Sequence, residues 1–519
     1  MIVIGSGISA LTLAGILSRF NKKKVLILEQ HSRTGGYSHS FSRKGYTWSA
    51  GFHYIGNIFN GKLAGIVLSF ITDGKLHWCK TPEPFESFQF PDFTFSVYGE
   101  EKKFRNDLIE AFPEEKKAIR SYFRDIKKVS FWFVLYYLSR FLPAFFSRPL
   151  ELICSVFDKL ALMSTEEYLK SKFKSEKLKS IIISQWGNYG LPPSQSAFMI
   201  HGLVANHFIN GGYYPEGGTD KILESIVPSI IKNGGTILHN TSVTNVIIEN
   251  GRAIGVATRS QKNKEAPLNN YYAPVIVSSA GAYNTFTKLV PEHLNLPFKN
   301  KCLELSRPSV CVALYLGLKD GINSLGFSGA NCWIYGTFDH EDSFLNTELL
   351  NGKPSFCFLS FTPPDKITGK VNTATIIALT NYDSFKEWGH QISGKRDKCY
   401  YELKEKIAAG LIEFVTARYP GFSSMIDYYE LGTPLSAEKF TASHEGGMYG
   451  LPATPERYRQ KWLSVKTPID GLYLTGTDVC SLGIVSSMMS GFATASYLNG
   501  PAGLFKLVRH MRKSVKRQS

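Results

Sequence analysis

The sequence lacks the cysteine patterns that hold metal ions or disulfides. Its eight cysteines are scattered singly, and no pair forms a C-x-x-C or zinc-type spacing. Neither a metal site nor a disulfide framework is therefore predicted, and a reducing compartment is the simpler interpretation. No Ser/His/Asp or Cys/His set typical of nucleophilic catalysis can be recognised either. The sequence thus offers no motif for metal-bound or nucleophilic chemistry.

The chain is also short of long apolar runs. Its most aromatic segment, residues 129–146, is interrupted by Arg140 and Pro143. It falls short of the roughly 20 apolar residues that a membrane-spanning helix needs. Two interpretations stay open: a helix in the plane of a membrane interface, with Trp and Tyr at headgroup level, or a buried helix or pocket wall.

Acidic residues are fewer than basic ones: 43 Asp and Glu stand against 59 Lys and Arg, so the formal net charge is +16. No nucleic-acid module, internal repeat or low-complexity tract is visible, so we rank a membrane above nucleic acid as the anionic partner. The last 16 residues contain no acid, and they form either a basic amphipathic tail that touches anionic lipid or a solvated disordered end. The tail cations are Lys506, Arg509, Arg512, Lys513, Lys516 and Arg517.

What the chain does have is an informative beginning. The apolar run 1–4 leads into Gly5-Ser6-Gly7-Ile8-Ser9-Ala10, then an apolar helical stretch, then a second apolar run that ends on Glu29. This order of strand, glycine turn, helix, strand and acid is typical of a dinucleotide-binding unit. Gly5 permits the tight turn, Gly7 lets the backbone approach a pyrophosphate, and Ala10 lets the helix pack close to the strand. A carboxylate at position 29 can accept hydrogen bonds from a ribose.

The length of 519 residues predicts more than one core. Alternating aromatics at 88–97 predict sheet, residues from about 107 to 174 read as helical, and Asn250-Gly251 predicts a hairpin turn. Further strands are expected near 309–317, 355–361 and 374–380. We expect FAD-binding parts at 1–75, 201–290 and 441–503, a sheet segment and helical, membrane-facing lobe at 76–200, a substrate domain at 291–440, and a basic tail at 504–519.

Several motifs together resemble the two-part FAD site of the amine-oxidase-like flavoproteins. They are the 5–10 turn, Glu29, Arg33-Thr34-Gly35-Gly36 and Gly476-Thr477-Asp478. Residues 51–56, 213–218 and 446–450 resemble segments of the branch that contains phytoene desaturases, carotenoid isomerases and retinol saturases. The resemblance implies an α/β fold: a Rossmann-like FAD-binding domain assembled from both chain ends, a mixed-sheet substrate domain and a helical lobe.

The resemblance also implies roles for individual residues. Glu29 would bind the adenosine ribose, Val243 would offer its backbone to the adenine, and Asp478 would bond the ribityl or pyrophosphate region. The alternatives are an ordinary sheet residue for Val243 and a helix cap for Asp478. The other cofactor-binding candidates are Gly5, Gly7, Ala10, Arg33, Gly35, Gly36, Gly476 and the start of the last helix at Gly483, Ile484 and Val485.

The same resemblance implies an FAD-dependent oxidoreductase acting on C=C bonds of an apolar polyene or isoprenoid, by saturation, desaturation or isomerisation, with NAD(P)H as one candidate electron donor. His53, Tyr54, His444 and Glu445 are candidate proton donors by position, and packed structural roles are their alternative. A flavin amine oxidase and a non-catalytic prenyl- or lipid-binding protein are the competing functions. The reducing-compartment interpretation, with no signal peptide before the first strand, predicts a cytoplasmic location, and peripheral membrane contact stays open.

Overall fold

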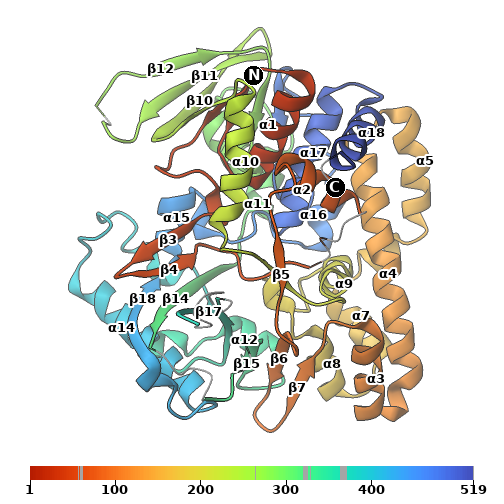
Figure 1. The fold of residues 1–519 in the computed structure, drawn as a ribbon, viewed down its shortest axis with the longest axis vertical. Helices are drawn as coiled ribbons and strands as arrows, with labels where there is room; N and C mark the ends of the chain where they lie inside the picture. The colour runs from red at the N-terminus through yellow and green to blue at the C-terminus, as the bar shows by residue number, and fades with distance from the viewer. Residues whose placement is uncertain are drawn as a thin grey trace.

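The structure is a computed structural model, and it describes residues 1–517 except 57, 59–61, 264, 320–324, 328 and 363–370. Three parts can be followed in Figure 1: a parallel sheet with its helices, a second and larger sheet, and a helical lobe along one side. The predicted fold class is confirmed.

The first part is a five-stranded parallel sheet in the order β19-β13-β1-β2-β9. Its strands come from both ends and the middle of the chain: β1 (Ile2–Ile4), β2 (Leu26–Leu28), β9 (Thr236–Leu238), β13 (Ile276–Ser278) and β19 (Leu472–Leu474). Val3 packs toward one buried face, and its neighbours Ile2 and Ile4 pack toward the other. A strand buried on both faces needs apolar residues at every position, which is why these segments read as unbroken apolar runs.

Helices cover one face of this sheet. They are α1 (Ile8–Asn21), α2 (Leu63–Ile71), α10 (Asp220–Lys232) and α17 (Ile484–Leu498), and α17 follows position 483 as predicted. Helices α1 and α17 cross closely, since a Cβ at Gly491 would collide with the backbone of α1. The other face carries the antiparallel sheet β10 (Thr241–Glu249), β11 (Arg252–Ser260) and β12 (Asn269–Tyr272). Asn250 and Gly251 have positive φ, as the predicted hairpin turn requires.

The second part is a seven-stranded mixed sheet in the order β18-β14-β17-β16-β15-β6-β7. The three predicted strands are confirmed as β14 (Val310–Leu318), β16 (Phe356–Phe361) and β17 (Thr373–Thr380). The aromatic alternation forms β6 (Glu86–Gln89) and β7 (Thr94–Val97), which join this sheet through a parallel β6–β15 pairing. The remaining members are β15 (Asn331–Tyr335) and β18 (Ile426–Gly432), and α14 (Lys398–Thr416) packs against the sheet.

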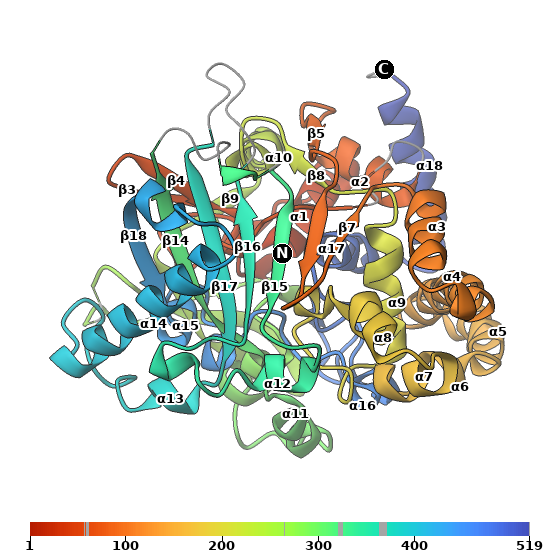
Figure 2. The same cartoon turned by 90° about the horizontal axis from the view of Figure 1, so that it is seen from below.

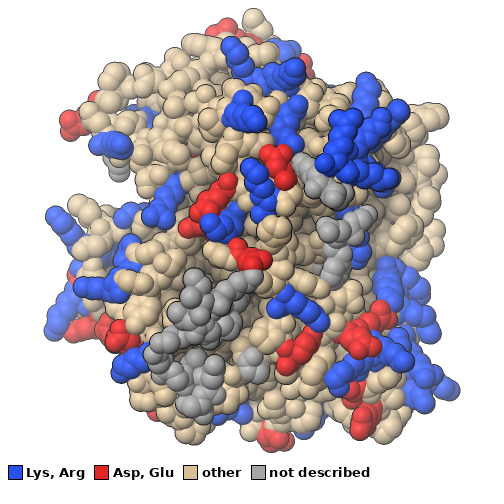
Figure 3. All heavy atoms as spheres, viewed as in Figure 1, with Lys and Arg blue, Asp and Glu red and all other residues tan. Residues whose placement is uncertain are grey.

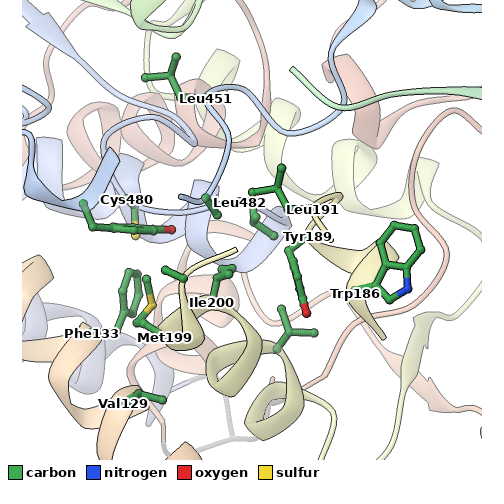
Figure 4. Packing of buried hydrophobic residues seen from close by; sticks show 14 of the residues in the cluster. Val129, Phe133, Trp186, Tyr189, Leu191, Met199, Ile200, Leu451, Cys480 and Leu482 are labelled. Atoms are coloured by element: carbon green, nitrogen blue, oxygen red, sulfur yellow. The ribbon is translucent and has the colours of Figure 1, made fainter. Parts of the chain in front are cut away.

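The third part is the helical lobe, which Figure 2 shows beside the seven-stranded sheet. The lobe consists of α3 (Glu101–Ala111), α4 (Lys116–Ser139), α5 (Ala144–Ser155), α6 (Asp158–Ala161), α7 (Thr165–Lys172), α8 (Glu176–Ile183) and α9 (Phe198–His207). Figure 4 shows its core, where Phe133 of α4 and Met199 of α9 lie near Cys480 and Leu482 from the loop between β19 and α17. The lobe is therefore packed onto the rest of the protein.

The two segments considered for membrane contact are both folded. Trp132 and Tyr137 of α4 are buried, so the interpretation that places the Trp and Tyr of this segment at headgroup level is wrong for these two side chains. The basic tail forms helix α18 (Gly503–Val515) and buries Leu507 and Met511 in the core beside α2 and α17. Among the described residues, no helix is both long and apolar enough to cross a membrane.

Candidate functional site

A cavity of about 850 Å³ lies between the five-stranded and seven-stranded sheets. Its wall begins at Glu29 and Val243, follows the glycine turn at Gly5 and Gly7, and continues to Ile377 of β17. Parallel strands end at one edge of a sheet, and ligands of such folds bind at that edge. The cavity therefore joins a nucleotide-type site to the larger sheet.

The glycine turn leaves room for a ligand rather than for protein. Gly5 has a φ of 86°, which favours glycine, and it leads the chain from β1 into α1. No other protein atom lies within 4 Å of the place where a Cβ of Gly7 would stand, although Gly7 lines the cavity. Packing of the protein therefore does not explain the glycine, whereas close approach of a pyrophosphate does.

Two helix N-termini line the same cavity. Helix α1 begins after Gly7 and α17 after Gly483, and neither has a side-chain cap or an acidic residue in its first turn. Their first N–H groups and positive dipole ends are available to an anionic group. Like Gly7, Gly483 has no protein atom within 4 Å of its Cβ position. The residues present thus fit a dinucleotide that extends from α1 to α17.

Glu29 lies where the ribose site is predicted, and it also holds the turn together. One of its oxygens accepts hydrogen bonds from the Ser6 backbone N–H at 2.9 Å and the Ser6 hydroxyl at 2.6 Å. The other accepts from the His31 N–H at 2.8 Å. Ser6 in turn accepts from the Gly35 N–H at 3.1 Å. Glu29 therefore links the glycine turn to the 33–36 loop, a connection through Ser6 that the motif did not reveal.

Asp478 joins three loops at the other end of the nucleotide site. Its carboxylate accepts from the backbone N–H of Ala282 at 2.7 Å and of Leu451 at 2.8 Å. The fully buried Arg457 donates to the backbone carbonyls of Leu451 and Thr477. Asp478 is thus a loop clamp on the cavity wall rather than a helix cap, and sequence reasoning missed Arg457 because no motif contains it.

The other predicted cofactor residues fall into two groups. Those on the cavity wall are Arg33, Gly35, Gly36, Val243, Gly476, Gly483 and Ile484. Arg33 also donates to the Ser40 carbonyl at 3.0 Å, and Val243 sits at a bulge in β10. Ala10 and Val485 do not reach the cavity, and both pack on the hydrophobic core of α1 and α17. Their positions suit helix packing rather than ligand contact.

Of the four candidate proton donors, His53 and His444 line the cavity, whereas Tyr54 and Glu445 are not among its lining residues. Burial lowers the pKa of the His53 imidazole to about 4, and its ring meets Phe358 edge-on with centroids 5.4 Å apart. Tyr54 is buried beside Glu86 and Asn188, away from the wall. Glu445 lies 3.8 Å from His444 and its side chain is 40% exposed, also off the wall.

The part of the cavity next to the seven-stranded sheet is mainly aromatic and apolar, and it also carries the ion pair of Arg43 and Glu430, with an N–O distance of 3.9 Å. Tyr37 donates to the Gly447 carbonyl at 3.3 Å, and Tyr449 donates to the Gly187 carbonyl at 3.1 Å. Burial raises the pKa of both phenols, so both hydroxyls stay protonated near neutral pH. Cys311, Tyr315 and Ile377 complete this wall. Sequence reasoning did not single out these side chains: Tyr449 lies in the family-like 446–450 segment without a role assigned to it, and Cys311, Tyr315 and Ile377 lie in strands that contain no motif.

Comparison with known proteins agrees with this geometry. Residues 3–66 match the family model of an NAD(P)-binding Rossmann-like domain. The chain is 30% identical to an all-trans-retinol 13,14-reductase of Danio rerio, covering 96% of this chain and 85% of the relative. It is 27% identical to a chloroplastic prolycopene isomerase of Arabidopsis thaliana, covering 98% and 84%. Among solved structures, an oxidoreductase from Methanosarcina mazei shares the fold with a TM-score of 0.63 at 16% identity, covering 95% and 98%.

Proposed function

We propose a reaction for this chain on the basis of its family. The chain belongs to the family of all-trans-retinol 13,14-reductases, in the retinoid and carotenoid branch of the FAD-dependent oxidoreductases. It is an FAD-dependent oxidoreductase acting on a C=C bond of an apolar polyene or isoprenoid. The reaction we propose is saturation of one such bond, in which one carbon receives a hydride and the other receives a proton.

One observation carries this proposal: a single cavity joins the glycine turn at Gly7 to the aromatic wall at Tyr315 and Ile377. A polar dinucleotide suits the first region, with its helix N-termini and backbone donors. An apolar polyene, which has few polar handles, suits the second. The two ligands would meet where the two walls join, near Tyr37 and Tyr449.

FAD, when bound, supplies two-electron hydride chemistry. The protein positions the two ligands, supplies an electrostatic field and excludes water. The N-terminus of α17 at Gly483 and Ile484 directs N–H groups into the cavity, which favours negative charge beside it. The aromatic wall excludes water from the reacting double bond.

The proton of the saturation step needs a protonated group on the wall. His53 is neutral at pH 7, because its pKa is about 4, so it does not hold a second ring proton there. The phenols of Tyr37 and Tyr449 are protonated, and both residues line the cavity. We assign the proton to Tyr449, because its hydroxyl bonds a backbone carbonyl that can be exchanged for substrate, whereas the Tyr37 hydroxyl also interacts with Thr441 and Ser443.

The electron donor is a separate part of the proposal. The saturation consumes two electrons in each cycle, so an external reductant has to restore the reduced cofactor. We propose NAD(P)H in this role. Rapid mixing of the oxidised flavoprotein with NADH or NADPH, under anaerobic conditions, should bleach the flavin absorbance. A flavin that is reduced by dithionite but by neither nucleotide would contradict this part alone.

The reaction is tested with the purified full chain. The cofactor is extracted and identified by mass spectrometry, and the FAD-loaded protein is then incubated with reductant and all-trans-retinol. A product heavier by two hydrogen atoms supports saturation, whereas an unchanged mass with a new retention time would show isomerisation instead. Hydrogen peroxide release on addition of amines would point to an amine oxidase. A colourless protein that takes up neither FAD nor electrons would contradict an enzyme function.

A further inference from the structure

The helical lobe exposes a concentrated group of apolar side chains on α5 and on Val156, the residue that follows it. Phe145 is 82% exposed, Leu152 72% and Val156 74%, and Phe146 and Ile153 are also exposed. We call these five residues the α5 patch. Helix α5 packs along α4, which adds exposed Phe131 and Val134. Soluble proteins scatter such residues singly, so a cluster of this kind marks an interaction surface.

Basic side chains lie beside the α5 patch. Helix α18 contains no acidic residue and exposes Lys506, Arg509, Arg512 and Lys513. A hollow of about 290 Å³, lined by Phe141, Pro143 and Leu504 among others, lies where the α4–α5 turn meets the start of α18. Figure 3 shows the basic cluster over α18 next to a surface over α5 that is free of charged atoms in this view. The apolar and basic surfaces are therefore neighbours.

The charge decides between two occupants of this face. If the occupant were a second copy in a symmetric dimer, the α5 patch and the α18 cations of one copy would pack against the same elements of the other copy. Helix α5 itself is balanced, with Arg148 and exposed Glu151, but the cations of α18 would then face like charge, on a chain whose net charge is +16. An anionic bilayer offers both an apolar layer and negative headgroups.

The geometry of α5 sets how the protein would lie on a bilayer. The helix has 12 residues, with Cys154 and Ser147 buried on one side and the patch on the other. Such a helix is too short to cross a bilayer and suits a position parallel to its surface. We propose that α5 is the element of this protein that inserts into the surface of an anionic membrane, with the basic face of α18 contacting the headgroups.

This proposal concerns a different surface from the cavity and does not depend on the reaction. Helices α4 and α18 expose fewer apolar side chains than α5: α18 buries Leu507 and Met511 and exposes Phe505, and α4 buries its tryptophan and exposes Phe131 and Val134. The larger group of exposed apolar side chains is the α5 patch, so we assign the insertion to α5 and the contact with headgroups to the cations of α18.

Vesicle flotation tests the insertion. The full chain is mixed with phosphatidylcholine vesicles that contain phosphatidylserine, and the floated fraction is measured against lipid concentration. The double variant Leu152→Ser with Val156→Ser should bind at least about tenfold more weakly, because two apolar side chains no longer leave water. Both positions are exposed, so the melting temperature should stay unchanged. The matched control is Leu345→Ser with Ile392→Ser, which alters residues that are 61% and 71% exposed elsewhere and should bind like the wild type.

A second variant tests the charge. Arg509→Gln with Lys513→Gln should weaken binding to these vesicles by about tenfold and reduce its salt dependence. Equal binding of the wild type to vesicles of phosphatidylcholine alone would overturn the role of α18. Wild-type binding by the α5 double variant would overturn the proposal, as would a wild-type dimer that this variant converts to a monomer, because the patch would then be a subunit interface.

Discussion

Buried carboxylates differ between the part of the molecule built on the five-stranded sheet, which we call the cofactor half, and the part built on the seven-stranded sheet, which we call the substrate half. Glu29 and Asp478, in the cofactor half, accept hydrogen bonds from backbone N–H groups of Ser6, His31, Ala282 and Leu451. Glu86, in strand β6 of the substrate half, lies behind the cavity wall and accepts from the side chains of Tyr54, Gln185 and Trp333. Burial raises the pKa of Glu86 to about 7.

The difference shows how each half suits its ligand. Backbone dipoles are fixed in place by the fold, so the cofactor half presents a rigid polar surface to a charged dinucleotide. In the substrate half, buried Glu86 is held by side chains rather than by the backbone, and burial favours its uncharged form. The cavity wall there is mainly aromatic and apolar, and the charged residues Arg43 and Glu430 on it form an ion pair. Four changes test this contrast.

The largest effect is expected from Asp478→Ala. The change leaves the N–H groups of Ala282 and Leu451 buried without an acceptor. We expect a loss of about 2–5 kcal/mol in the free energy of unfolding. Denaturant unfolding of the FAD-saturated protein measures it. Asp478→Asn keeps one carbonyl acceptor and should lose less stability than Asp478→Ala. Equal stability of the wild type and both variants would show that the Asp478 clamp does not stabilise the fold.

Stability measured over a series of pH values should separate the contribution of Glu86 from that of the Asp478 clamp. The pKa of Glu86 is about 7 in the folded protein and 4.5 for the ordinary carboxyl, so the folded state resists ionisation. Its contribution to stability is complete below pH 4.5 and is lost as the pH rises to about 7, by about 3 kcal/mol in total. Glu86→Gln should remove this slope from denaturation midpoints measured between pH 4.5 and 8. A slope that persists in the variant would assign it to another group.

Gly7→Val should weaken the cofactor half selectively. The side chain would occupy the open space beside the turn and separate the phosphates from the N–H groups of α1. Loss of one or two charge-assisted hydrogen bonds weakens FAD binding by roughly 10- to 100-fold. Titration of the apoprotein with FAD measures this. Gly15→Ala in the same helix is the control, since its Cβ would meet Ile71 at an ordinary 3.7 Å and lies off the cavity.

The smallest effect is expected from Tyr449→Phe. The variant keeps the ring and removes the hydroxyl that bonds Gly187. We expect kcat to fall about tenfold, because Tyr37 and water can partly replace a general acid. KM and flavin content should not change. A fall in flavin content together with kcat would instead make Tyr449 part of the cofactor site.

The cofactor half could be predicted well because its chemistry depends on local spacing. Gly5, Gly7 and Glu29 follow from one motif, and the parallel strands read as unbroken apolar runs. The return of the chain at β19, beside β13, was suggested by Gly476-Thr477-Asp478. That Asp478 clamps Ala282 and Leu451 could not be predicted, because the three positions are distant in sequence.

The substrate half was less predictable. Its strands were located, yet the pairing of β6 with β15 joins residues about 245 positions apart, and no local signal sets that register. Tyr54 and Glu445 were suggested by position in family-like segments, but one side chain turns toward Glu86 and the other is partly exposed. Tyr37, Tyr315 and Tyr449 reach the cavity because the tertiary packing brings separate loops and strand β14 together.

The most direct test is a single turnover of the FAD-loaded protein. The enzyme-bound flavin is reduced under anaerobic conditions and mixed with the polyene, and both the flavin absorbance and the polyene mass are followed. We predict that flavin reoxidation and the gain of two hydrogen atoms by the polyene occur at the same rate and in equal amounts. Flavin that stays reduced while the polyene keeps its mass would contradict the account.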